Sequence, residues 1–100
     1  MANVSFLARM TVKDGREEEF IRLARELERQ VHANEPDTIY YRFFRLRNPR
    51  EFAVMESFAD EAAEELHMNT SYLQEIAPNL LDCMEGGDPP YTREYLDPME

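Results

Sequence analysis

The stretch TIYYRFFRLRNPREFAVMESF, residues Thr38–Phe58, decides the fold. Residues Thr38–Leu46 and Phe52–Phe58 are rich in aromatic and β-branched side chains, which favour strands. Between them lies the polar segment Arg47–Arg50, which contains Asn and Pro and has the composition of a tight connection. The stretch therefore predicts two strands that pair in antiparallel fashion.

The residues before this hairpin predict a strand followed by a helix. Apolar side chains recur at every second position over residues 4–12, which is the period of a strand. A turn at Lys13–Gly15 follows, and Asp14 with Glu17 resembles a capping box that begins a helix. The turn residues 34–37 end this helix. Its apolar stripe consists of Phe20, Leu23, Ala24, Leu27 and Val31.

The residues after the hairpin predict two short helices and a last strand. Asp60 is placed to be the N-cap of a helix over Glu61–Met68. The pattern Ser71–Gln74 resembles a second capping box, which begins a short helix that Pro78 disturbs. The rest of the chain consists of a loop over residues 84–90 and an alternating strand over Tyr91–Leu96.

The resulting order, β-α-β-β-α-β, indicates a single α+β domain of the ferredoxin-like type over residues 1–100. In that arrangement the helices cover one face of the sheet. The strand Thr38–Leu46 nevertheless has large apolar side chains on both faces: Ile39, Tyr41 and Phe43 on one, and Tyr40, Phe44 and Leu46 on the other. A monomer would expose the second set as an apolar patch. We therefore expect a homodimer in which two sheets pack face to face.

The net charge of −10 limits the possible partners. Nucleic-acid binding needs clustered Lys and Arg, so we expect no nucleic-acid partner, and the same negative field disfavours anionic membrane surfaces. The N-terminal residues lack the cationic and apolar regions of a signal peptide. No apolar run approaches the roughly 20 residues that a membrane span needs. We expect a cytoplasmic protein without a membrane partner.

The segment EELHMNTSYLQEIAP, residues 64–78, contains the best candidate catalytic side chains. His67 ends one predicted helix and Tyr72 begins the next, so the break between them would let both side chains border one cavity. An imidazole with its ordinary pKa of about 6.5 can accept a proton at neutral pH, and a phenol can donate a hydrogen bond in the same cavity. Ordinary packing, with one nitrogen of His67 and the hydroxyl of Tyr72 satisfied, explains the same pattern.

The sequence contains no pattern that would hold a metal ion or a nucleotide cofactor. The two histidines and Cys83 are widely separated and form no recognisable zinc set. Neither a P-loop nor a G-x-G-x-x-G motif is present. We therefore expect no cofactor, and a reaction in which the substrate supplies the reactive electrons while the protein supplies a base and a dry cavity.

Three segments of the chain resemble antibiotic biosynthesis monooxygenase domains, a family that includes quinol monooxygenases. They are ARMTVKDGREEEF (residues 8–20), RNPREFAVMESFADEAAEELHMNTSYLQEIAPNL (residues 47–80) and YTREYL (residues 91–96). The most specific part of the resemblance is a series that leads to His67 and consists of Glu56, Phe58, Asp60, Ala62 and Ala63. The resemblance covers nearly the whole chain.

The resemblance implies a dimeric α+β barrel that oxidises a small aromatic compound (a quinol, a phenol or an anthrone-like ring) with O₂ and without a cofactor. His67 would be the base that deprotonates the substrate, or the hydrogen-bond partner of that base, and Tyr72 would line the same cavity. The side chains that would shape the substrate cavity are Tyr41, Phe43, Phe52 and Phe58. Family members often have Trp where Phe58 stands, and a second His where Tyr72 stands.

Two alternatives stay open on the sequence alone. The same cavity could bind a small ligand in a dimeric module without catalysis, or it could isomerise a small carbonyl compound with His67 moving a proton. Haem cleavage is disfavoured, because the Asn and the His that haem-degrading relatives use have no counterparts at Ala8–Arg9 and Ile76–Pro78.

Overall fold

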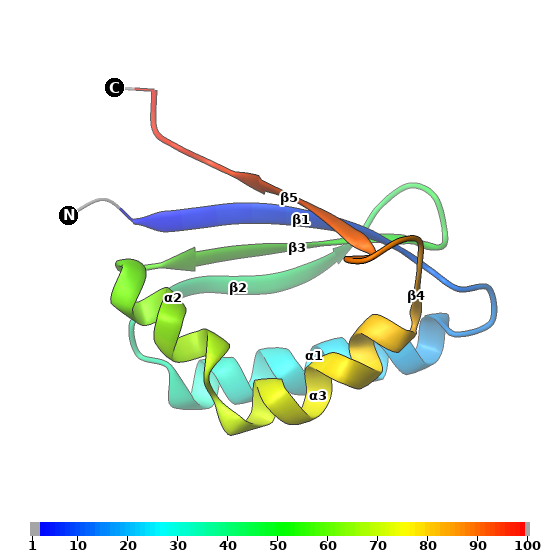
Figure 1. Cartoon of the computed structure of the whole chain (residues 1–100), viewed down its shortest axis with the longest axis horizontal. Coiled ribbons are helices and arrows are strands. Elements are labelled where there is room, and N and C mark those ends of the chain that lie inside the picture. Colours follow the sequence, from blue (N-terminus) through cyan, green and yellow to red (C-terminus); the bar gives the residue numbers. More distant parts are fainter. Residues whose placement is uncertain (1–2, 100) are drawn as a thin grey trace.

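The computed structural model describes residues 3–99, which form an antiparallel sheet with helices on one face (Figure 1). The elements are β1 (Val4–Val12), α1 (Glu17–Asn34), β2 (Thr38–Arg45), β3 (Glu51–Phe58), α2 (Glu61–Met68), α3 (Ser71–Asp82), β4 (Met84–Glu85) and β5 (Tyr91–Tyr95). The strand order is β2-β3-β1, with β5 beside β1 and the short β4 at the end of β1. The predicted ferredoxin-like α+β fold is confirmed.

The register of the sheet sorts the side chains into a covered face and an uncovered face. Phe6 on β1 lies opposite Glu56 on β3 and Tyr95 on β5. Because side chains alternate along a strand, these three residues share one face. It is the face that the helices cover, since Phe6 and the other apolar residues of β1 in the same phase are buried.

Helix α1 packs its predicted stripe against the covered face. Four residues of that stripe are fully buried: Phe20, Ala24, Leu27 and Val31. The helix begins after Arg16, whose side chain makes no capping hydrogen bond, so the capping box predicted at Asp14 and Glu17 is wrong. The reason is the turn before it. The Arg16 N–H donates to the Lys13 carbonyl at 3.0 Å and Gly15 has a φ of 88°, which leaves Asp14 two residues ahead of the N-cap.

Helices α2 and α3 are separated by the predicted break. Asp60 is the N-cap of α2, and its Oδ1 accepts a hydrogen bond from the Ala63 N–H at 2.8 Å, as expected. The second predicted capping box is wrong, because α3 begins after Thr70 without a side-chain cap and Gln74 donates to the Met68 carbonyl instead. Helix α3 also continues through Pro78 to Asp82. Within residues 3–99, no helix is long and apolar enough to cross a membrane.

The segment after α3 contains an element that the sequence did not predict. Met84 and Glu85 were expected in a loop, but they form β4, which pairs with Thr11 and Val12 at the end of β1. This pairing connects the end of α3 to the sheet, and the chain then returns along β1 as β5 (Figure 1).

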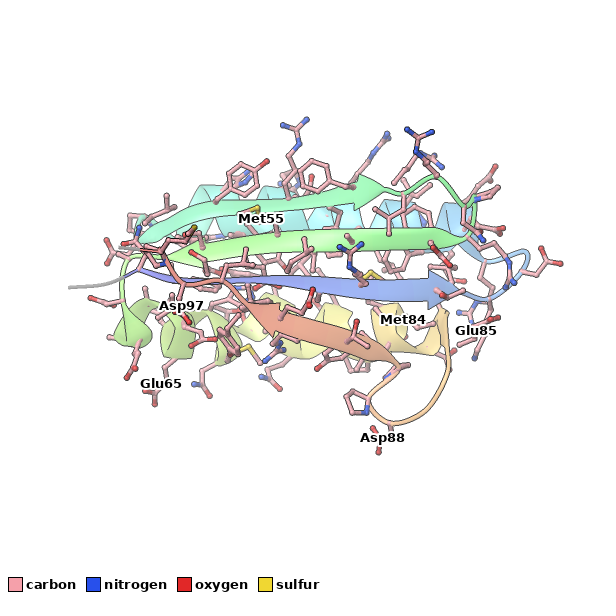
Figure 2. The ribbon with its side chains drawn as sticks, turned by 90° about the horizontal axis from the view of Figure 1, so that it is seen from above. Met55, Glu65, Met84, Glu85, Asp88 and Asp97 are labelled. Carbon is pink, nitrogen blue, oxygen red and sulfur yellow. The ribbon has the colours of Figure 1, made fainter. Side chains whose placement is uncertain are left out.

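The uncovered face of the sheet has the apolar character that the sequence predicted, with one exception. Figure 2 looks onto this face, where Met55 of β3 lies opposite Leu7 of β1. Tyr40 and Phe44 of β2 point the same way and are 38% and 39% exposed. Ile39 was expected beside Tyr41 in the core, but a bulge between Thr38 and Tyr40 takes it out of phase and leaves it exposed.

Candidate functional site

A cavity of about 190 Å³ lies between the covered face of the sheet and the helices. Its wall is formed by β1, β2, β3 and β5 on one side and by residues of all three helices on the other, and it is mostly apolar. The side chains that bring polar atoms to this wall are Tyr41, Glu56, His67, Tyr91 and Arg93. The cavity therefore combines an apolar interior with a few polar groups, which is typical of small-molecule sites.

His67 lies in the last turn of α2 and is only 2% exposed. Its ring packs against those of Tyr41 and Phe58, with centroid distances of 5.1 and 5.3 Å. The Nδ1 atom lies 3.1 and 3.0 Å from the two carboxyl oxygens of Glu35. Because a carboxylate only accepts hydrogen bonds, this contact assigns a proton to Nδ1, and in the tautomer with Nδ1–H the lone pair is on Nε2.

Glu35 follows the last residue of α1 and is 5% exposed, which is unusual for a carboxylate. Besides His67, its carboxylate accepts hydrogen bonds from the Thr38 hydroxyl at 2.7 Å and from the Tyr72 hydroxyl. Three donors thus converge on one buried carboxylate. A carboxylate in this position fixes the tautomer of the imidazole and stabilises the imidazolium that forms when Nε2 takes a proton.

Glu56 lies on the opposite side of the imidazole, on β3, and is 7% exposed. Its Oε1 atom is 3.7 Å from Nε2 of His67, which is too far for a hydrogen bond. Burial raises the pKa of Glu56 to about 8, although the charge of Arg93 opposes this shift. At neutral pH the Glu56 carboxyl is therefore mostly protonated, and its O–H can donate a hydrogen bond within the cavity.

Tyr72 lies elsewhere than the sequence suggested. It begins α3, but its hydroxyl donates to Glu35 and its side chain is not part of the cavity wall. The expectation that His67 and Tyr72 border one cavity is therefore wrong for Tyr72, which contacts the carboxylate on Nδ1 of the imidazole. Burial and the hydrogen bond to Glu35 raise the pKa of Tyr72, so its hydroxyl stays protonated.

The four aromatic residues predicted to shape the cavity divide into two pairs. Tyr41 and Phe43 of β2 line it. Phe58 is fully buried against His67 and Phe6, so it supports the imidazole without forming part of the wall. Phe52 packs on Phe20, with ring centroids 4.8 Å apart, and does not line the cavity.

The two carboxyl groups approach opposite nitrogens of the same ring. Glu35 and Glu56 therefore do not converge on one point, where they could share a metal ion with His67. Within residues 3–99, no group of three or more His, Cys, Asp or Glu side chains is arranged to hold one.

Sequence reasoning missed Glu35 and the roles of Glu56 and Arg93. Glu56 could have been noticed, because it is the only charged residue in the apolar phase of Phe52–Phe58. Arg93 likewise shares the phase of Tyr91 and Tyr95 on the last strand. Glu35 carries no such signal, since a Glu beside Pro at the end of a helix reads as an ordinary stop.

The arrangement can remove a proton from a hydroxyl group held in the cavity. In such a step Nε2 of His67 would accept the proton, Glu35 would stabilise the resulting imidazolium, and the apolar wall would exclude water that weakens these interactions. The protonated Glu56 beside Nε2 can return a proton to a leaving oxygen.

Comparisons with known proteins identify the family and the related folds of this chain. A family model described as "Antibiotic biosynthesis monooxygenase" matches residues 4–79. The structure of a candidate antibiotic biosynthesis monooxygenase from Caulobacter crescentus is similar at 26% identity and a TM-score of 0.88, covering 98% of this chain and 91% of that one. The structure of a conserved protein from Methanosarcina mazei is similar at 24% identity and a TM-score of 0.84, covering 96% of this chain and 92% of that one. No curated protein matches this chain.

Proposed function

Because this chain belongs to the antibiotic biosynthesis monooxygenase family, we propose that it oxidises a small aromatic hydroxy compound with O₂ and without a cofactor. The proposal is supported above all by one observation: Nδ1 of the buried His67 imidazole is hydrogen-bonded to the Glu35 carboxylate, and the same side chain lines an apolar cavity. That arrangement is suited to forming a phenolate, the electron-rich species that such a reaction needs.

The proposed reaction begins with transfer of the substrate hydroxyl proton to Nε2 of His67. The phenolate gives one electron to O₂, and the resulting radical and superoxide combine to form a carbon–oxygen bond at a ring carbon that bears hydrogen. The hydroperoxide then loses water: the ring C–H bond gives up its hydrogen as a proton while the O–O bond breaks, the distal oxygen keeps its own proton and gains a second one, and the proximal oxygen stays as a carbonyl. The net change is that one phenol and one O₂ give one quinone and one water.

Glu56 has a role in the last of these steps. Its carboxyl is mostly protonated at neutral pH and faces the cavity next to Nε2. It can therefore protonate the departing oxygen, which is the general-acid contribution that O–O cleavage needs.

We further propose that the protein acts as a homodimer through the uncovered face of the sheet. This face has partly exposed apolar side chains, among them Tyr40 and Phe44, and no helix within residues 3–99 covers it (Figure 1). Pairing with a second copy would remove that apolar area from water without blocking the cavity, which lies on the other face.

An isomerase is the second candidate, because His67 and Glu56 are two proton-transfer groups 3.7 Å apart on one cavity. Such a pair could move a proton between neighbouring carbons of a carbonyl compound. Unlike the monooxygenase, an isomerase would consume no oxygen.

The test is oxygen consumption with hydroquinone and anthrone substrates in metal-free buffer, for the unmodified protein, His67→Ala and His32→Gln. His32 is an exposed histidine outside the cavity, and its Nε2 atom is within hydrogen-bond distance of the Tyr41 carbonyl, at 3.0 Å. We expect oxygen uptake that His67→Ala abolishes and His32→Gln keeps. Equal uptake by His67→Ala would refute the role of His67, and an absence of uptake by the unmodified protein would refute the monooxygenase.

A further inference from the structure

The mouth of the cavity contains an arginine that the reaction above does not use. Arg93 lies on the covered face of β5, opposite Ala8, and is exposed as well as part of the cavity wall. Its guanidinium carbon lies 4.6 Å from the ring centroid of Phe6 and 5.6 Å from that of Tyr91. Contact with two aromatic faces limits the orientations of the guanidinium, because cations are attracted to such faces.

This guanidinium has no acidic partner among the described residues. Arg16, Arg29 and Arg50 each form an ion pair with a carboxylate, whereas Arg93 has no carboxylate within 4.0 Å in residues 3–99. Glu56 is close enough to interact electrostatically, but it is mostly neutral at pH 7. The positive charge of Arg93 is therefore uncompensated at the mouth of the cavity.

A second donor accompanies this charge. Tyr91 is two residues before Arg93, on the same face of β5, and also lines the cavity. No hydrogen bond within residues 3–99 involves its hydroxyl. A guanidinium fork beside a phenol is a donor set that matches the two oxygens of a carboxylate.

From this geometry we propose that Arg93 binds a carboxylate on the substrate, so that the substrates are hydroxyaryl carboxylates. The inference rests on the proposed function, because it assumes that the ring lies in the apolar part of the cavity with its hydroxyl at His67. The size agrees with it. An apolar cavity of about 150 Å³ holds benzene, so a cavity of about 190 Å³ has room for one substituted ring.

The net charge of −10 does not oppose this assignment. Charges more than about 8–10 Å away are largely screened at physiological ionic strength, whereas a contact with Arg93 is direct. The overall charge reduces the association rate of an anion but leaves the local interaction in place.

The experiment measures binding without oxygen, so that it does not depend on turnover. Calorimetric titrations under anaerobic conditions compare three probes with the same ring: hydroquinone, gentisate (hydroquinone with a carboxylate) and methyl gentisate, whose ester is uncharged. The proteins are the unmodified chain, Arg93→Gln and Arg22→Gln. Arg22 is exposed on α1 and does not line the cavity. Its replacement by Gln therefore changes the net charge by the same amount as Arg93→Gln but leaves the cavity wall as it is.

We expect the unmodified protein and Arg22→Gln to bind gentisate about tenfold more tightly than the other two probes, as one charge-assisted contact allows. Arg93→Gln should bind all three with similar affinity. The inference is overturned if the unmodified protein shows no preference for gentisate, or if Arg93→Gln keeps that preference. Preferential binding without oxygen uptake in air would support the carboxylate site and refute the monooxygenase.

Discussion

Replacing Glu35 by Gln tests the central feature of the site, the buried carboxylate on His67. The change keeps the shape of the side chain but removes its charge. Glu35 accepts hydrogen bonds from His67, Thr38 and Tyr72. An amide has one carbonyl oxygen and one NH₂ group, so not all three donors can keep an acceptor. The Thr38 hydroxyl is the easiest to satisfy in another way, because it can rotate and accept a hydrogen bond from the amide.

The expected effect on stability follows from these contacts. Hydrogen bonds to a charged group contribute about 1.5–3 kcal/mol each, and the amide replaces them with weaker neutral ones. We expect the free energy of unfolding to fall by about 2 kcal/mol, which corresponds to a Tm lower by roughly 8–16 °C in a chain of this size.

The expected effect on activity is larger than the effect on stability. Without the carboxylate, the imidazolium formed after proton transfer has no negative partner on Nδ1. Nε2 of His67 therefore becomes a weaker base. General acid–base catalysis contributes about 10²- to 10⁴-fold, and we expect kcat/KM for oxygen uptake to fall within that range.

The matched control is Glu28→Gln. Glu28 lies on α1 and its Oε2 accepts a hydrogen bond from the Phe43 N–H at 2.6 Å, so it is another structural carboxylate, but it does not contact His67. The assays are urea unfolding and oxygen uptake, both at a temperature where each variant is folded. Glu28→Gln should lose stability and keep its kcat/KM. A folded Glu35→Gln variant with full activity would refute the reasoning, and so would an equal loss of activity in Glu28→Gln.

Two further predictions concern pH and assembly. Burial raises the pKa of Glu56 from its ordinary value of 4.5 to about 8 in the folded protein. Between about pH 4.5 and 8, the folded state therefore keeps a proton that the unfolded state has already released. The free energy of unfolding should fall in that window as pH rises, by at most about 1.4 kcal/mol per pH unit from this group. Glu56→Gln should make the profile flatter in urea titrations, and an unchanged slope would contradict the raised pKa. For assembly, Met55→Glu places a charge in the centre of the uncovered face of the sheet (Figure 2), opposite Leu7. We expect sedimentation to show a dimer for the unmodified chain and a monomer for Met55→Glu; a monomeric unmodified chain at micromolar concentration would exclude the proposed dimer.

The periodic features of the fold could be predicted from the sequence because each depends on nearby residues. Alternation over residues 4–12, the apolar stripe of α1 and the N-cap Asp60 specified a strand, a helix and a helix start, and all three are confirmed. The two capping boxes failed for a local reason too. The side chains matched the pattern, but the backbone placed the first helical residue elsewhere.

The site shows where sequence reasoning reached its limit. His67 was identified because an imidazole at the end of an amphipathic helix is conspicuous by its chemistry. Its partner Glu35 is 32 residues away in the chain, and nothing in a helix-ending Glu-Pro pair indicates that a later helix will bring a histidine onto it. Tyr72 was identified too, but its position next to Glu35, away from the cavity, depends on the path of α3.

The sequence by itself determined the order of the longer strands and helices, the apolar side chains on both faces of the Thr38–Leu46 strand and the choice of His67 as the candidate base, because these follow from the period and chemistry of neighbouring residues. Only the tertiary structure decided which groups meet: Glu35 on Nδ1 of His67, Glu56 near Nε2, and Arg93 at the mouth of the cavity. The physical reason is that hydrogen bonding, burial and charge depend on distance in space. Residues that are far apart in the chain come close only when the sheet and its helices have packed.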